Sequence, residues 1–212
     1  MRALEGLSEK IPLAIKRFPF GVAATQHRSS TFQLSSLLEQ FHRATREANK
    51  LVLGRSADDL TNRWASSSWS VTECLDHLAR TSLSFLPSIS RAVATASELN
   101  SNRPLRTGAI ALLLIRNLEP PYRLRYKAIP QLAPQETDFE AAWSNFKKSQ
   151  SQLSEAVRSA AGLAIDKVRV QCPVYARMTY NVYGAFRMLA AHQRRHLWQM
   201  QQVLSVLDGK RR

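Results

Sequence analysis

The sequence predicts an all-α protein, folded as an antiparallel four-helix bundle with a short accessory helix. Three observations predict this class: several long segments carry apolar residues at helical spacing, only seven of the 212 residues are glycine, and 44% are hydrophobic. A chain of this length has room for one domain with a sizeable core. We therefore expect an N-terminal extension over residues 1–30, a bundle domain over residues 31–208 and a basic tail over residues 209–212.

The first two helices are predicted from apolar stripes. The first helix covers about residues 31–53, and its apolar face consists of Leu34, Leu37, Leu38, Phe41 and Ala48. The second covers about residues 71–98, and Ser70 with Glu73 forms the pattern of a capping box at its start. Pro87 lies inside this second pattern, so we expect the helix to kink or to end there.

The rest of the chain predicts one short and two long helices. The accessory helix is expected over residues 107–118, since two prolines follow it. The third long helix should run from about residue 138 to a glycine at 162 that is typical of a C-cap. An irregular passage around residues 172–173 separates it from the last helix, expected over residues 180–207. Side chains on facing helices of such a bundle can converge on one site.

Three histidines in two of these helices form a candidate metal site. His192 and His196 are four residues apart, so both imidazoles lie on one helix face, as two ligands of one divalent cation require. His77 lies in the apolar stripe of the second helix and should point into the bundle. A lone buried histidine is more often hydrogen-bonded to a hydroxyl or carbonyl group, whereas the trio favours a metal. His27 and His42 are expected to be bystanders.

The order and spacing of these residues resemble the DinB/YfiT-like family of four-helix-bundle metalloproteins. The resemblance covers about residues 31–207 and is carried by Trp69, Ser70, Glu73, His77, Leu78, His192, His196 and Leu197. It implies that His77, His192 and His196 hold one divalent transition metal, with water at the open positions. Zinc or nickel is the expected metal, and iron or manganese is the second choice. It also implies a possible homodimer and, as in some relatives, a low-molecular-weight thiol as substrate.

Three neutral nitrogen ligands leave a divalent cation its full charge and an open position, which can lower the pKa of water or coordinate a thiolate. Hydrolysis and thiol transfer to an electrophile are therefore the two candidate reactions, and the resemblance favours thiol transfer. Glu73 is the candidate catalytic base, with Asp76 as a second carboxylate beside His77, although a glutamate here is more often a helix cap. Cys74 is either an additional soft ligand or, as we rather expect, a small buried hydrophobe.

The formal net charge of +14 supports a competing hypothesis. Residues 101–130 hold six basic residues against Glu119 alone, and such a surface attracts nucleic acid, anionic lipid headgroups or acidic substrates. The alternative is a basic helical binding or dimerisation module with affinity for polyanions and no catalysis. Arg195 lies off the histidine face, yet it could border a pocket there and hold an anionic ligand.

Composition also bears on the compartment. Two cysteines are too few for a disulfide framework and suggest a reducing compartment, so we expect a cytoplasmic protein. The best apolar run, residues 108–115, is far shorter than a membrane span. The basic N-terminal extension is interrupted by prolines and charges and makes a poor signal peptide.

Overall fold

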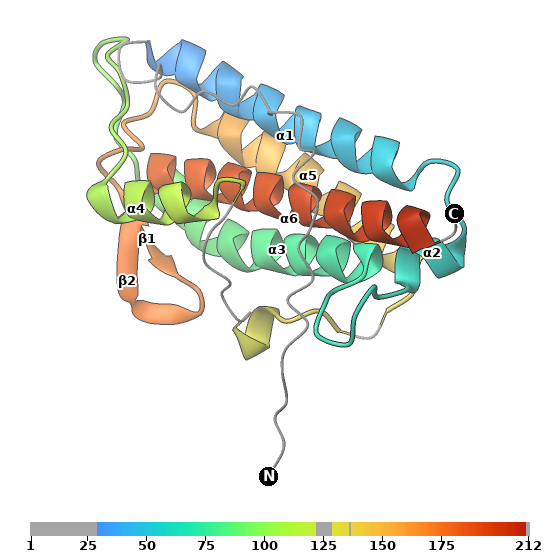
Figure 1. The fold of residues 1–212 in the computed structure, drawn as a ribbon. Coiled ribbons are helices and arrows are strands. Elements are labelled where there is room, and N and C mark those ends of the chain that lie inside the picture. The colour runs from blue at the N-terminus through green and yellow to red at the C-terminus, as the bar shows by residue number, and fades with distance from the viewer. Residues whose placement is uncertain (1–28, 122–128, 136, 211–212) are drawn as a thin grey trace.

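The computed structural model describes residues 29–121, 129–135 and 137–210, and four long helices form its body (Figure 1). These helices are α1 (Ser30–Val52), α3 (Val71–Ala94), α5 (Phe139–Ser159) and α6 (Val182–Lys210). The all-α class predicted from the sequence is confirmed, because the sheet of the described part has only two short strands. Among the described helices, none is long and apolar enough to span a membrane.

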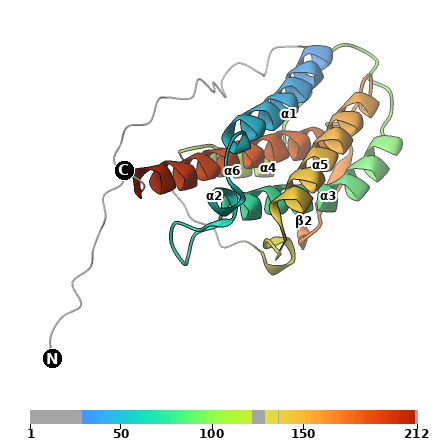
Figure 2. The same cartoon turned by 90° about the vertical axis from the view of Figure 1, so that its right-hand side faces the viewer.

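The long helices form two parallel pairs that run in opposite directions. Both α1 and α3 pack against α5 and α6, so α1 and α3 lie at opposite corners of the bundle, each between α5 and α6 (Figure 2). An ion pair between Arg55 and Asp208 joins the C-terminal ends of α1 and α6. A β-bridge between Glu98 and Leu163 does the same for α3 and α5. Because α3 and α5 are parallel, the connection over residues 95–138 must return along the whole bundle.

Smaller elements surround the bundle. They are α2 (Ala57–Thr61), α4 (Ala109–Leu118), the 3-10 turn η2 (Pro130–Leu132) and a hairpin of β1 (Arg169–Cys172) and β2 (Tyr175–Asn181). The predicted accessory helix is therefore present as α4, which packs against α6. The hairpin replaces the irregular passage expected around residues 172–173, so that prediction was wrong. Its first strand alternates exposed and buried side chains, the period of two that a strand on a protein surface requires.

The bounds of α3 and α6 differ from those predicted. Helix α3 neither ends at Pro87 nor extends to residue 98, but continues through the proline to Ala94. Pro87 is exposed, and its ring leaves one carbonyl group of the preceding turn without a helical partner. Helix α6 begins later than predicted because β2 continues to Asn181, whose side chain accepts a hydrogen bond from the backbone N–H of Gly184 (2.7 Å) and caps the helix.

Several predictions concern residues outside the described part. They include most of the N-terminal extension, His27, the last two residues of the basic tail, and three of the six basic residues in segment 101–130. Of the other three, Arg103 donates two hydrogen bonds to Asp166 (2.7 and 2.9 Å), whereas Arg106 and Arg116 are exposed. The proposed basic surface is therefore partly neutralised within the described part.

The core consists of two apolar clusters with a polar layer between them. On α6 the first cluster ends at Ala191 and the second begins at Leu197, so His192 and His196 lie in the interval. On α5 the same interval holds buried Gln150, whose Oε1 accepts a hydrogen bond from Nε2 of Gln193 (2.9 Å). A polar layer of this kind can hold a hydrophilic site inside a bundle, since buried polar groups need partners.

The close approach of α4 to α6 predicts the effect of one substitution. A Cβ atom at Gly184 would lie 2.8 Å from Cβ of Ala111 and 2.9 Å from Oδ1 of Asn181. We expect Gly184→Ala to lower the free energy of unfolding by about 1–3 kcal/mol, as overpacking usually does. Gly209→Ala is the matched control, because a Cβ there meets no heavy atom within 4 Å. Urea denaturation should separate the two variants, and equal stability would contradict the tight α4–α6 contact.

Candidate metal centre

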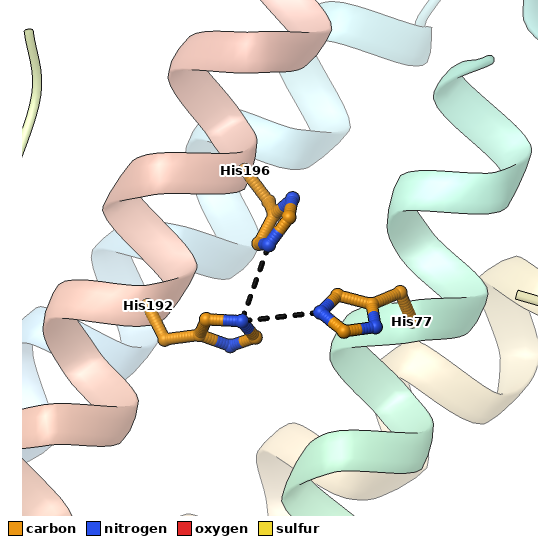
Figure 3. A group of neighbouring side chains, drawn as sticks. All are labelled: His77, His192 and His196. Atoms are coloured by element: carbon orange, nitrogen blue, oxygen red, sulfur yellow. Dashed lines mark hydrogen bonds between the residues drawn. The ribbon is translucent and has the colours of Figure 1, made fainter. Parts of the chain in front are cut away.

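Helices α3 and α6 bring three histidine side chains together (Figure 3). Nε2 of His192 lies 3.1 Å from Nε2 of His77 and 3.1 Å from Nε2 of His196. One nitrogen from each ring lies within 4.8 Å of the others, and no other group of three potential ligands is found in the described residues. The structure therefore places all three predicted ligands at one point between two helices.

The hydrogen-bonding capacity of the rings indicates that a cation fits between them. Nδ1 of His77 lies 2.6 Å from the carbonyl oxygen of Leu132. A carbonyl only accepts, so Nδ1 donates, and Nε2 of the neutral His77 ring carries a lone pair. Nε2 of His192 bears at most one hydrogen, so it cannot donate to both of its close neighbours, His77 and His196. A single cation can accept the lone pairs of all three nitrogens.

Two of the three nitrogen separations agree with the size of such a cation. Two nitrogens that each lie about 2.05 Å from one metal, as for zinc, and 3.1 Å from each other subtend an angle of about 98° at the metal. This angle lies between about 90° for octahedral and about 109° for tetrahedral coordination. Both 3.1 Å separations in the trio are therefore compatible with a shared ion.

The surroundings keep the three rings neutral. Burial lowers the pKa of His192 and His196 well below the usual value, and the neighbouring rings and Arg195 lower them further. Burial also lowers the pKa of His77, although the Leu132 carbonyl and Asp76 oppose the shift. Neutral imidazole is the form that binds a metal ion, so these low pKa values favour ligation at neutral pH.

Trp69 forms a wall of the site. Its ring centroid lies 4.8 Å from that of His77 and 5.6 Å from that of His196, and it is nearly parallel to the latter ring. Trp69 precedes Ser70, the N-cap of α3, so this wall lies next to the capping box at the helix start. In the sequence, the only indication of this wall is that Trp69 directly precedes the capping box at Ser70.

Residues 129–135, which we call the covering segment, contact three residues of α3 around the ligand. Besides the Leu132 carbonyl that holds His77, the backbone N–H of Gln135 donates to Oδ2 of Asp76 (2.9 Å). Nη2 of Arg80 donates to the carbonyl oxygen of Gln131 (3.2 Å). A carbonyl that accepts the N–H of the ring nitrogen not facing the metal, as that of Leu132 does here, orients a ligating histidine. Sequence reasoning missed the three contacting groups because two are backbone carbonyls of a segment distant in the chain.

Glu73, the predicted base, lies at the start of α3. Its Oε2 accepts a hydrogen bond from the backbone N–H of Ser70 (2.8 Å), and the side chain of Ser70 accepts one from the backbone N–H of Glu73 (3.2 Å). Arg63 also donates to Oε2 of Glu73 (2.8 Å). Burial alone would raise the pKa of Glu73, but the hydrogen bonds from Arg63 and Ser70 lower it overall. The capping role is thus directly visible, and the role as a base stays a prediction.

The remaining candidates lie away from the trio. Cys74 is fully buried in the second apolar cluster, where burial strongly raises the pKa of its thiol, and it is not part of the metal-ligand group. It therefore has the environment expected of a small buried hydrophobe. His42 is exposed on α1.

Comparison with protein families matches residues 40–200 to a model described as the DinB superfamily. This range contains all three histidines. Searches of curated proteins and of solved structures found no match.

The capping box predicts how Glu73 contributes to stability. We expect Glu73→Ala to lower the free energy of unfolding by about 1 kcal/mol, because the Ser70 N–H loses its partner. Metal content should not change. Glu155→Ala on α5 is the control, since its pair with Arg158 is exposed and worth little. Thermal denaturation and elemental analysis measure both effects, and loss of the metal in Glu73→Ala would instead place this carboxylate in the metal site.

Proposed function

Since the chain belongs to the DinB superfamily, we propose that it is a metalloprotein that holds one divalent transition metal, zinc or nickel, at His77, His192 and His196. The convergence of three neutral imidazoles, two of them buried and that of His192 half-buried, carries this proposal. Imidazole nitrogen suits zinc, nickel, copper and iron, so the metal is chosen by the preference that the family resemblance implies. The ligand group found among the described residues contains three neutral imidazoles and no carboxylate, and such a group leaves the full charge of the cation available to a substrate.

The side chains around the trio have distinct parts in this proposal. His77 is fixed by the Leu132 carbonyl, and the indole of Trp69 covers one side of the rings. His77 and His196 are 5% and 6% exposed, whereas His192 is only partly buried. A substrate would therefore approach on the side of His192, which we call the access side. A divalent cation held there by neutral ligands supplies a Lewis acid with open positions.

We propose further that the site is catalytic and transfers a low-molecular-weight thiol to an electrophile, with hydrolysis as the second candidate. A thiolate sulfur is a soft ligand suited to zinc, and the largely buried surroundings of the site strengthen its attraction to the cation. Glu73 is a weak proton acceptor because its pKa is lowered. A thiol whose own pKa falls on binding would need less help from such a base.

Removal of two ligands tests the metal site. We expect about one equivalent of zinc or nickel in the purified parent and none in the double variant His77→Ala/His196→Ala. His42→Ala is the matched control, since this histidine is exposed on α1 and should not affect metal content. Elemental analysis measures the metal, and circular dichroism checks that the fold is kept. Equal metal in the parent and the double variant would contradict the site.

Two assays separate the candidate reactions. With zinc or nickel bound, the parent should accelerate the loss of free cysteine in the presence of an electrophilic dye, and the double variant should not. An acceleration restricted to a nitrophenyl ester would select hydrolysis instead. If neither reaction depends on His77 and His196, the catalytic proposal is wrong.

The basic-module alternative predicts a different pattern. Affinity for a polyanion such as duplex DNA would fall steeply with salt and would not respond to substitution of the histidines. A gel-shift titration of the parent and the double variant at two salt concentrations distinguishes this behaviour from metal-dependent function. Gel filtration of the same samples tests the predicted homodimer.

A further inference from the structure

The covering segment, the olive turn below α3 in Figure 1, is held to the bundle mainly by hydrogen bonds. Among its seven residues, all of which the structure describes, only the side chain of Leu132 is buried. Its hydrogen bonds to α3 involve Asp76, His77 and Arg80, which lie close together along that helix. A segment with so little buried apolar surface depends on such contacts for its position.

The contact with His77 joins the segment to a proposed metal ligand. Nδ1 of this ring donates to the carbonyl oxygen of Leu132 (2.6 Å), which leaves the lone pair on Nε2, the nitrogen that faces His192. When Nε2 binds a cation, electron density moves toward the cation and Nδ1–H becomes a stronger donor. The docked segment and the bound metal therefore favour the same state of one imidazole.

Two charged side chains hold the segment on either side of this ligand. Asp76 directly precedes His77, is 6% exposed, and its Oδ2 accepts a hydrogen bond from the backbone N–H of Gln135 (2.9 Å). Arg80 lies one helical turn beyond His77, and its Nη2 donates to the carbonyl oxygen of Gln131 (3.2 Å). Hydrogen bonds of ionised groups are stronger than those of neutral ones. Neither side chain belongs to the metal-ligand group found in the described residues.

From these contacts we infer that docking of the covering segment and binding of the metal are coupled, with Asp76 and Arg80 as positioning residues that act on the metal through the segment. The inference rests on the proposed metal site and adds a regulating element to it. Coupling between two equilibria is reciprocal, so the metal fastens the segment by the same factor by which the docked segment tightens the metal. A change that loosens the segment should therefore weaken metal binding although no ligand is lost.

Hydrogen exchange measured by mass spectrometry tests the first half of this coupling. In the parent, zinc should slow exchange in a peptide that contains residues 129–135 by at least about fivefold. The reason is that the backbone N–H of Gln135, which donates to Asp76, is protected only while the segment is docked. The β1–β2 hairpin is the internal control, because its strands pair with each other and not with the metal site.

The zinc affinity of Arg80→Met tests the second half. This variant keeps a long apolar side chain but removes the donor to Gln131. Loss of a positive charge near a cation would by itself raise the zinc affinity, whereas the coupling predicts a fall of at least about fivefold. Arg91→Met is the matched control, because Arg91 is exposed on the same helix and its Nη2 donates to Oγ of Ser88 (3.2 Å). Competition with a chromogenic chelator measures the affinities.

Failure of this inference and failure of the metal site are distinguishable. A parent protein that binds no zinc overturns the metal site itself. A parent that binds zinc without slower exchange in the covering segment overturns the coupling alone, and this measurement needs no variant. An Arg80→Met protein that binds zinc as tightly as Arg91→Met, or more tightly, overturns the coupling as well.

Discussion

The mutual contact of three imidazoles, two of them buried and one half-buried, is the constraint on which the rest of the structure depends. Neutral nitrogens that face one another at 3.1 Å cannot all be satisfied by hydrogen bonds among themselves. The arrangement is stable only if a further group accepts their lone pairs or if the surrounding fold holds them in place. Both conditions point to the same region, the polar layer between two apolar clusters where α3 crosses α6.

The connectivity of the bundle explains how that region is built. Parallel packing of α3 and α5 requires a long return over residues 95–138, and this return brings α4 against α6 and the covering segment against α3. The covering segment then supplies the carbonyl that fixes the tautomer of His77. An up-down arrangement with short loops would leave no backbone at this position. The topology and the orientation of the ligand are therefore linked through one connection.

The sequence predicted the parts of the site that depend on local periodicity. The spacing of His192 and His196, the inward position of His77 and the capping box at Ser70 are all set within one or two helical turns. The Leu132 carbonyl, the burial of Arg195 and the hairpin were not predicted in this way. Each depends on the path of a loop or on packing between distant segments, and neither leaves a periodic signal in the residues themselves.

X-ray absorption spectroscopy of the zinc-loaded protein tests the three-histidine site most directly. The site predicts three imidazole nitrogens at about 2.0–2.1 Å from the metal, with the outer-shell scattering typical of histidine rings, and an oxygen or exogenous ligand completing the shell. A sulfur shell at about 2.3 Å without added thiol would place a cysteine, Cys74 or Cys172, at the metal. A shell of oxygen atoms alone would show that the metal lies elsewhere, and either result would contradict ligation by His77, His192 and His196.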